Sequence, residues 1–289
     1  TDTVSLESLP LDDPKVYETI SSGNTLGIFQ VESSGFQELM KKLKPDCFED
    51  IIASVALYRP GPLETGMVGD FVDRKHGRKK VVYPHPMLEV ILKPTYGVIV
   101  YKEQVMQIAQ VMSGFSLGTA DILRRAMGKK KKEVMAQQEK MFVDGAIKNG
   151  VHAHTAKEIF ELIEKFAGYG FNKSHSAAYA LITYQTAYLK TYYPVQFLAA
   201  LLSTEMDSTE DIVKYIGEAR VQKIEILSPC INRSEKIFTP EGDRIRFGLG
   251  AIKGLGDSAI DAILESRKKH GMYVSLFDFC EKADLRKIN

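Results

Sequence analysis

Residues 166–194 read FAGYGFNKSHSAAYALITYQTAYLKTYYP, and through the second half of this stretch a tyrosine recurs every four or five positions. That spacing predicts one long helix that begins near Ser174, because residues three or four apart lie on the same face of a helix. One face carries large residues only, and a stripe of this kind is most simply a core-facing stripe. Its members are Leu181, Tyr184, Tyr188 and Tyr192. The stretch therefore predicts a mainly α fold organised around a helix with a buried tyrosine stripe.

The opening of this helix differs from the rest because it is polar and cationic. His175 and Tyr179 are four residues apart and share a second face, with Asn172 and Lys173 beside them at the N-terminus. A helix N-terminus with a lysine favours an anion, and a tyrosine one turn further offers a flat surface for a base. The pattern is what nucleotide binding requires. From the residues alone, the alternative is a hydrogen-bonded core histidine beside a buried tyrosine.

Cationic side chains also stand at the ends of other predicted elements. Arg59 precedes a stiff Pro-Gly-Pro loop in YRPGP, and Lys102 lies at a strand-to-helix turn in VYKEQVMQ. In ADILRRAMG, Asp121 lies four residues before Arg125 and is expected to pair with it. That pairing would leave Arg124 the freer of the two. Cations at element ends commonly bind polyphosphates, so all four cations are candidate nucleotide-binding residues.

Two basic runs interrupt a chain whose formal net charge is only +1. One is DRKHGRKK over residues 73–80, and the other is formed by Lys129, Lys130, Lys131 and Lys132. Basic patches inside a near-neutral chain suit a partner made of phosphate, such as DNA. The alternative for either run, taken alone, is a solvated helix end.

Helical signals extend outward from the opening stretch until about residue 230. Predicted helices there begin with capping boxes and end at glycines or prolines. Beyond this point, KIFTPEGDRIRFGLG predicts a β-hairpin around Glu241–Asp243. We therefore expect a multi-helix domain with short strands over residues 1–230, followed by a smaller hairpin-containing segment over residues 231–289.

Length and composition limit the class of protein. A chain of 289 residues with 44% apolar content can form one large or two ordinary globular domains. No apolar run reaches the ~20 residues that span a bilayer, and the first residues show no signal-peptide pattern. Three widely spaced cysteines predict neither a disulfide framework nor a zinc site, which favours a reducing, cytoplasmic compartment. Both ends suggest a piece of a longer protein, truncated at the C-terminus.

No familiar catalytic or metal-binding motif is present in the sequence. Asp12 and Asp13 stand before Pro14, where a helix N-cap explains them better than a metal site. No pair of carboxylates is convincingly placed for two-metal chemistry. The sequence therefore predicts no catalytic and no metal-binding residue within this chain.

Four segments resemble, nearly word for word and in the same order, the C family of bacterial replicative DNA polymerases. They are VALYRPGPLETGM, PTYGVIVYKEQVMQIAQ, LRRAMGKKK and FAGYGFNKSHSAAYALITYQTAYLKTYYPVQFLAALL. The resemblance covers essentially the whole chain. It implies that residues 1–230 are a fingers domain, which in this family closes over the incoming deoxynucleoside triphosphate. The catalytic palm, whose aspartates bind Mg²⁺, would lie outside this chain.

The resemblance also implies roles for individual residues. Lys173 and His175 would face the triphosphate or sugar, Tyr179 would lie against the nascent base pair, and Arg124 and Arg125 would bind triphosphate oxygens. The full-length protein would be a DNA-directed DNA polymerase, and this fragment alone would be inactive. Implied partners are template-primer DNA and deoxynucleoside triphosphates. A sliding clamp, a clamp loader and a proofreading exonuclease would bind mainly outside this chain, and no membrane is implied.

The tail, LGAIKGLGDSAIDAILESRKK over residues 249–269, resembles one helix-hairpin-helix motif. Gly254 and Gly256 would form the tight turn between two apolar helices, with Lys253 and Arg267 as flanking cations. Such glycines let backbone N–H groups reach a DNA phosphate, which gives binding without base readout. The alternative is an ordinary turn between two helices.

Two hypotheses of different class remain at this point. The first is a polymerase segment that binds nucleotide and DNA, and the second is an α-helical module that binds nucleic acid or protein without using nucleotides. The face shared by His175 and Tyr179, together with Arg124, separates them, because a pure DNA binder needs cations but no stacking tyrosine at a helix mouth.

Overall fold

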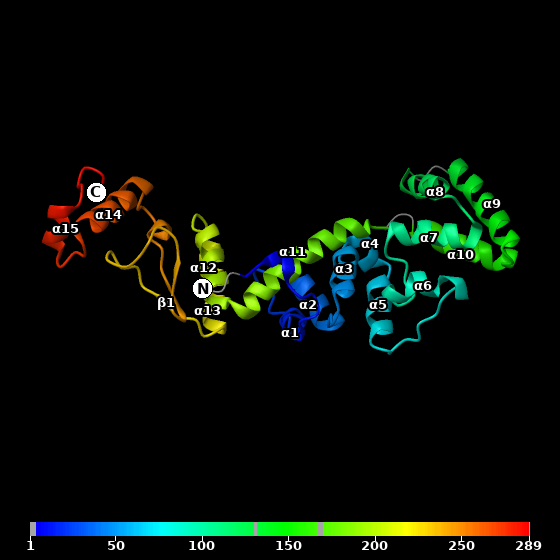
Figure 1. Cartoon of the computed structure of the whole chain (residues 1–289), viewed down its shortest axis with the longest axis horizontal. Coiled ribbons are helices and arrows are strands. Elements are labelled where there is room, and N and C mark those ends of the chain that lie inside the picture. Colours follow the sequence, from blue (N-terminus) through cyan, green and yellow to red (C-terminus); the bar gives the residue numbers. More distant parts are fainter. Residues whose placement is uncertain (1–3, 130–131, 167–169, 289) are drawn as a thin grey trace. The chain divides into compact units, whose positions relative to one another are not determined.

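The long helix predicted from residues 166–194 forms as α11 (Lys173–Tyr192) and begins one residue before the expected start (Figure 1). The computed structural model describes residues 4–129, 132–166 and 170–288. The chain divides into two compact units, Thr1–Ala187 and Tyr188–Asn289, and the division falls inside α11. Both units are mainly helical, as predicted. The functional boundary expected near residue 230 stays a prediction.

The first half of the first unit consists of short helices packed on one another. They are η1 (Leu6–Ser8), α1 (Pro14–Ser21), α2 (Ser34–Leu43), α3 (Phe48–Leu57), α4 (Pro60–Glu64) and α5 (Met67–Lys75). Asp13 caps α1 as predicted, since its side chain accepts the backbone N–H groups of Lys15 and Val16. Helix α2 lies against α1, α3 and α5. Helix α3 is the most buried of these, since every residue from Asp50 to Leu57 is buried, Asp50 and Ser54 included.

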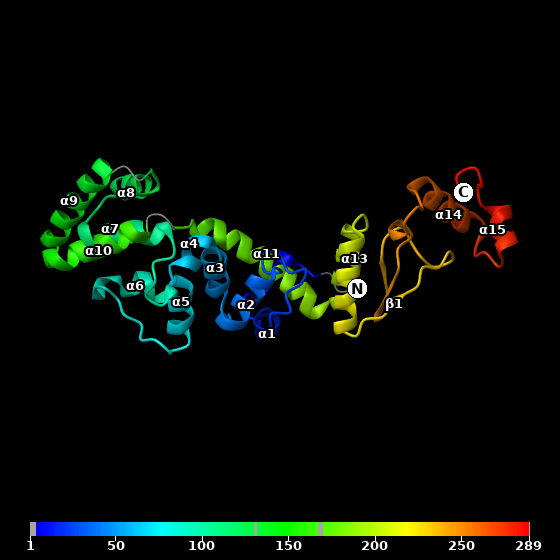
Figure 2. The ribbon, with the colours of Figure 1, turned by 180° about the vertical axis from the view of Figure 1, so that it is seen from behind.

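The second half of this unit is a bundle with its own apolar core. Its elements are η2 (Pro86–Leu88), α6 (Glu89–Leu92), η3 (Lys93–Thr95), α7 (Lys102–Ser113), α8 (Leu117–Lys129), α9 (Lys132–Lys148) and α10 (Ala153–Phe166). Helix α9 packs against α7, α8 and α10 (Figure 2). Phe142, Phe160 and Ile163 are fully buried or nearly so at the centre. Leu88 and Leu92 join the same core from the preceding segment.

Helices α7 and α9 approach closely at Gly145. A Cβ atom there would lie 2.3 Å from the backbone oxygen of Ser113 and 3.0 Å from its Cβ. The Ser113 hydroxyl donates to the backbone oxygen of Phe142 at 2.7 Å, which fixes the contact from the other side. Only a residue without a side chain therefore allows this approach.

Gly145→Ala should lower the free energy of unfolding by about 1–3 kcal/mol, because backbone must move to admit the methyl group. Gly118→Ala in α8 is the matched control. The added methyl group would meet only the Ser116 hydroxyl at 3.9 Å, and alanine is the better helix former. Chemical denaturation of both variants measures the difference. Equal stability of the two variants would contradict the close approach.

The core-facing stripe of α11 differs from the predicted one. Tyr184 is fully buried, as expected, but Leu181 and Tyr192 are each 38% exposed and Tyr188 is only partly buried. The fully buried face consists mostly of small residues around Tyr184, namely Ser176, Ala180, Thr183 and Ala187. The prediction of a buried aromatic stripe was therefore wrong. The face of small residues is buried instead, because small side chains let neighbouring backbone approach the helix closely.

The second unit combines helices with a small mixed sheet. Its elements after α11 are α12 (Pro194–Thr204), α13 (Thr209–Val221), β1 (Ile226–Leu227), β2 (Thr239–Glu241), β3 (Arg244–Arg246), η4 (Leu249–Ala251), α14 (Asp257–His270) and α15 (Leu276–Lys282). The strand order is β1-β3-β2. Strand β3 pairs antiparallel with β2, with Glu241 opposite Arg244, and parallel with β1, with Ile226 opposite Ile245. The predicted hairpin is therefore confirmed.

The helix-hairpin-helix motif predicted over residues 249–269 differs from the structure in one detail. Before the Gly254–Gly256 turn there is a single 3-10 turn, η4, in place of a full helix. Leu249 of η4 still packs with Ile260, Ile263 and Tyr273 in a small buried cluster. In the described part of the chain, no helix has both the length and the apolar character that crossing a membrane would need.

Candidate functional site

The N-termini of α7 and α11 are tied together by a short pairing of extended backbone. Tyr101 and Phe171 form an isolated parallel bridge. The Lys102 N–H donates to the Phe171 oxygen at 2.9 Å, and the Phe171 N–H donates to the Val100 oxygen at 3.4 Å. Since α7 begins at Lys102 and α11 at Lys173, two helix starts and two lysines are brought to one place.

A row of rings runs along one face of α11 from its mouth. The centroids of Phe171 and His175 are 5.4 Å apart, and those of His175 and Tyr179 are 4.2 Å apart with the rings inclined by 35°. The row continues to Phe29, whose centroid lies 5.3 Å from that of Tyr179. At the other end, the Arg59 guanidinium carbon lies 4.2 Å from the Phe171 ring centroid. His175 is exposed and Tyr179 partly so, which leaves ring surface open to a ligand. We call Arg59, Phe171, His175, Tyr179 and Phe29 the ring row.

Phe29 reaches the ring row because its backbone is hydrogen-bonded to α11. Its N–H donates to the Thr186 hydroxyl at 3.1 Å, and its oxygen accepts from the Thr183 hydroxyl at 3.1 Å. Two threonines of α11 thus position the ring that backs Tyr179. Sequence reasoning missed Phe29, since nothing local marks a residue so far away in the chain. It also missed Phe171, although that residue stands four positions before His175.

The mouth of α11 already holds one carboxylate. The Lys173 backbone N–H donates to Glu103 Oε2 at 3.0 Å. The Lys173 ammonium lies 5.6 Å from the centroid of the Tyr101 ring. Burial lowers the pKa of Arg59, although its guanidinium stays cationic near neutral pH. The mouth therefore combines three cations, Arg59, Lys102 and Lys173, with one acid that a second anion would have to displace or share. Asn172 is exposed beside them.

The two arginines of α8 are both engaged. Asp121 accepts from Arg124 Nη2 at 2.6 Å and from Arg125 Nε at 2.7 Å. The expectation that Arg124 would be freer is wrong, because one carboxylate reaches both side chains from successive positions on the same face. The pKa of Asp121 is lowered, first by its hydrogen bond from Arg124. Of the neighbouring lysine run, Lys130 and Lys131 lie outside the described residues, as do the side chains of Lys129 and Lys132.

The glycine turn of the tail is open to solvent. Lys253, Gly254 and Gly256 are all exposed, and Gly254 has a left-handed φ of +88°. A Cβ atom built on either glycine would meet no atom within 4 Å. Arg267 is not a free flank of this turn. Its guanidinium donates to the Ser234 oxygen at 2.7 Å and pairs with Glu235 at 2.6 Å, so it serves the fold.

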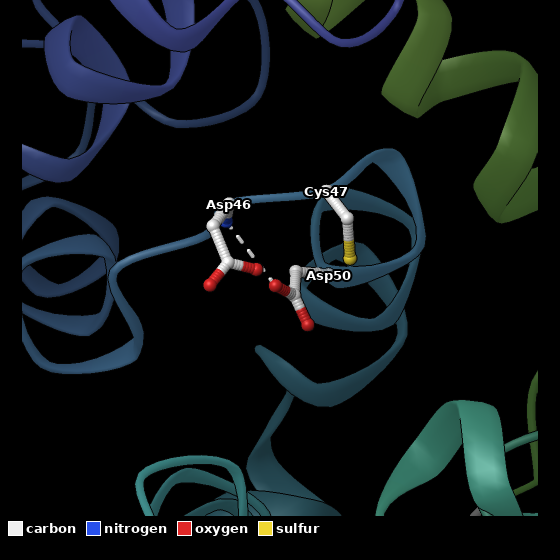
Figure 3. Close-up of side chains that lie close together, drawn as sticks. All are labelled: Asp46, Cys47 and Asp50. Carbon is white, nitrogen blue, oxygen red and sulfur yellow. Dashed lines mark hydrogen bonds between the residues drawn. The ribbon is translucent and has the colours of Figure 1, made fainter.

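Figure 3 shows one acidic cluster in which Asp46, Cys47 and Asp50 gather their side chains. The cation between the carboxylates is the ammonium of Lys75, 2.7 Å from Asp46 Oδ1 and 2.7 Å from Asp50 Oδ2. Burial, and then the nearby charge of Asp50, raises the pKa of the Cys47 thiol to about 11. A protonated thiol is a poor metal ligand. The cluster therefore fits a structural ion pair better than a metal centre.

Comparisons with known proteins agree with this architecture. Residues 1–150 match the family model described as the bacterial DNA polymerase III alpha subunit finger domain, and residues 223–289 match a helix-hairpin-helix motif. The chain is 56% identical to DNA polymerase III subunit alpha of Pseudomonas aeruginosa and 52% identical to that of Escherichia coli strain K12. Each alignment covers 99% of this chain and 25% of the relative, so the chain spans about a quarter of their length. The chain belongs to the family of bacterial DNA polymerase III α subunits, within which it comprises the finger domain and a helix-hairpin-helix segment.

Proposed function

We propose that, within the full-length polymerase subunit, the ring row binds the incoming deoxynucleoside triphosphate during template-directed DNA synthesis. The carrying observation is the continuous row from Arg59 through Phe171 and His175 to Tyr179, in which His175 is exposed and the other three are partly buried. The row lies beside the N-termini of α7 and α11, each of which begins with a lysine. Aromatic faces suit a base or sugar, and the cations suit a triphosphate. A module that bound only DNA backbone would need the cations but not the rings.

The remaining candidate residues extend this proposal. Lys102, Asn172 and Lys173 lie at the mouth and are assigned to the triphosphate end, and Arg124 and Arg125 to triphosphate oxygens once Asp121 shares them. DNA contacts are assigned to the lysine run 129–132 and to the exposed turn of Lys253, Gly254 and Gly256. That open turn supports the assignment, because backbone N–H groups without neighbouring side chains can approach a phosphate.

Mg²⁺ belongs to the proposed chemistry but not to this chain. Among the described residues, Asp46, Cys47 and Asp50 form the one group of three or more potential ligands, and the Lys75 ammonium already lies between its two carboxylates. We assign the metal to palm carboxylates outside this chain, where it would stabilise the displacement at the triphosphate. Template-primer DNA, the sliding clamp, the clamp loader and the proofreading exonuclease are the proposed partners, in the bacterial cytoplasm.

The isolated chain should not extend a primer, because the proposed metal-binding carboxylates are not part of it. Single-nucleotide incorporation on a labelled primer-template, with Mg²⁺ and all four deoxynucleoside triphosphates, measures this. The full-length subunit is the positive control. Extension by the purified chain at a rate above background would mean that catalytic residues lie within it.

Tyr179→Ala in the full-length subunit should lower kcat/KM for incorporation by roughly 5- to 150-fold, because a base–aromatic stack contributes about 1–3 kcal/mol. Tyr179→Phe keeps the ring and should retain nearly full activity. Single-turnover incorporation measured over a titration of nucleotide shows whether the variant weakens nucleotide binding or slows the chemical step.

Tyr192→Phe and Tyr192→Ala are the matched controls, since Tyr192 is exposed on the same helix but outside the ring row. They should leave incorporation unchanged. If Tyr179→Ala unfolds early yet incorporates normally per folded molecule, the ring row supports the fold and the nucleotide lies elsewhere. If DNA affinity collapses while nucleotide KM is unchanged, the row binds template or primer.

A further inference from the structure

A pocket of about 220 Å³ lies in the first unit, and none of its lining residues belongs to the ring row. Its walls come from one side of α5 along its length, the segment 97–99 and the last turns of α10. The apolar part of the lining is formed by Met67, Val98, Ile99, Leu162 and Phe166. The charged part is formed by Asp70, Arg74 and Lys165. An apolar pocket with a few convergent charges is typical of a ligand site.

Arg74 lacks a counter-charge. Its Nη1 donates to the Tyr96 oxygen at a long 3.3 Å, and its Nε is buried without a hydrogen-bond partner. No carboxylate of a described residue lies within ion-pair distance of it. Partly buried guanidinium groups are normally paired, since an unmatched donor and an uncompensated charge both cost stability. The covered Nε cannot itself contact a ligand, so the guanidinium offers an anion its uncompensated charge and its remaining terminal N–H groups.

The acid that lines the pocket does not supply that anion. Asp70 is paired with Lys79 at 2.7 Å, and both side chains are about half exposed. Lys165, exposed at the end of α10, adds a second cation to the lining. With Asp70 neutralised by Lys79, Arg74 and Lys165 leave the pocket with a net positive charge facing an apolar wall.

Because Gly97 has no side chain, its backbone can lie directly against the Arg74 guanidinium. Its φ is +77°, and a Cβ atom there would lie 2.8 Å from the Val82 oxygen and 3.1 Å from Arg74 Nη1. A side chain at this position would close the space in which Arg74 lies. Backbone conformation and sterics together therefore preserve an open cationic corner.

We propose that this pocket binds a small organic anion, a carboxylate or phosphate carried on a compact apolar body. Arg74 would grip the two oxygens in parallel, as its planar fork allows, and Lys165 would add a point charge. The apolar wall would take the body of the ligand. The pocket is smaller than the roughly 300–1,000 Å³ typical of drug-sized ligands, which favours a compact ligand.

The test uses the full-length subunit and ¹⁹F NMR with four separate probes. They are 4-fluorobenzoate, 4-fluorophenyl phosphate, the neutral isostere 4-fluorobenzamide, and inorganic phosphate as a competitor. We expect saturable line broadening for at least one of the two fluorinated anions and none for the amide. Whichever fluorinated anion binds more tightly identifies carboxylate or phosphate as the preferred head group. Displacement of it by inorganic phosphate at low concentration would show that the apolar body contributes little and overturn that part of the proposal.

Arg74→Gln should weaken binding of the preferred anion at least tenfold, and Lys165→Gln should weaken it several-fold. Lys165 is exposed, so its variant folds even if Arg74→Gln does not. Arg78→Gln is the matched control, because Arg78 is exposed, pairs with Asp73 and does not line the pocket. Unchanged affinity in both pocket variants would overturn the proposal. So would equal binding of amide and carboxylate, or no binding of any anion to the unaltered subunit.

Discussion

Replacing Tyr184 with alanine should lower the free energy of unfolding by about 3–5 kcal/mol, the range for deleting a fully buried aromatic ring. The Tyr184 ring is fully buried in the first unit, against Tyr17 at 5.6 Å and Phe48 at 6.3 Å between centroids. Its hydroxyl donates to the Pro10 oxygen at 2.7 Å and accepts from the Asp13 N–H at 3.1 Å. The side chain thus joins α11 to the segment that leads into α1.

Two further variants separate the contribution of the hydroxyl from that of the ring and its burial. Tyr184→Phe keeps the ring and should lower the free energy of unfolding by about 1–3 kcal/mol, because the backbone groups at Pro10 and Asp13 lose their hydrogen bonds to the hydroxyl. Tyr188→Ala should lower the free energy of unfolding less than Tyr184→Ala does, since Tyr188 is only partly buried and its ring is tilted against that of Tyr192, with the centroids 4.7 Å apart. Chemical denaturation of the three variants gives the order. If Tyr188→Ala proved the more damaging, the buried face of α11 would be the originally predicted aromatic stripe.

Lys75→Met should lower the free energy of unfolding by about 3–5 kcal/mol, because it leaves the buried carboxylate of Asp50 without its cation. The Lys75 and Asp50 side chains are 4% and 1% exposed. Burial alone would lower the pKa of Lys75, but the hydrogen bonds to Asp46 and Asp50 outweigh it and raise that pKa above its ordinary value. The lysine therefore stays charged throughout the physiological range, and the cost of losing it appears at neutral pH.

Removing both charges should recover much of the loss, so Lys75→Met with Asp50→Asn should be more stable than Lys75→Met alone. Lys79→Met is the matched control, since its pair with Asp70 is about half exposed and should contribute at most ~1 kcal/mol. A Lys75→Met loss no larger than that of Lys79→Met would show that Asp50 is satisfied without the lysine.

The cluster of Asp46, Asp50 and Lys75 should also make the stability of the fold depend on pH in the acid range. Burial opposes ionisation of Asp46, but the hydrogen bond from Lys75 outweighs it, and the pKa of Asp46 in the folded chain is below its ordinary value. A carboxyl group whose pKa is lowered by folding stabilises the fold above its unfolded pKa. That contribution disappears as the pH falls through the lowered pKa. Lys75→Met should therefore flatten the acid limb of a stability–pH profile.

Local sequence signals predicted the elements more reliably than the faces they bury. The Asp13 cap, the start of α11 and the hairpin at Glu241–Asp243 all depend on neighbours within a few residues, and all three formed. The buried face of α11 was misjudged because the prediction chose the largest side chains, although alanine is more often fully buried than tyrosine. Which face packs depends on how closely another backbone can approach, and Ala180 and Ala187 allow that where a tyrosine would not.

The candidate site shows the same difference between local signals, which the sequence reveals, and contacts between distant segments, which it does not. His175 and Tyr179 could be placed together from their spacing, and Phe171 could have been added by extending the spacing one turn back. Phe29 and Glu103 could not, because each reaches α11 through contacts between segments distant in sequence. Arg124 was misjudged for a simpler reason, since Asp121 lies within reach of both following arginines.

The bridge between Tyr101 and Phe171 has a consequence for how sequences of this family can vary in length. The bridge fixes Phe171, and successive residues of a helix are turned by about 100° from one another, so one residue more or less in the connection turns every later side chain of α11 relative to the bridge. One residue inserted or deleted between Phe171 and Lys173 would shift α11 against the bridge and part Phe171 from His175. Substitutions there can be absorbed one side chain at a time, whereas a change in length displaces the whole row at once. Natural insertions and deletions should therefore avoid these positions even where the residues themselves differ.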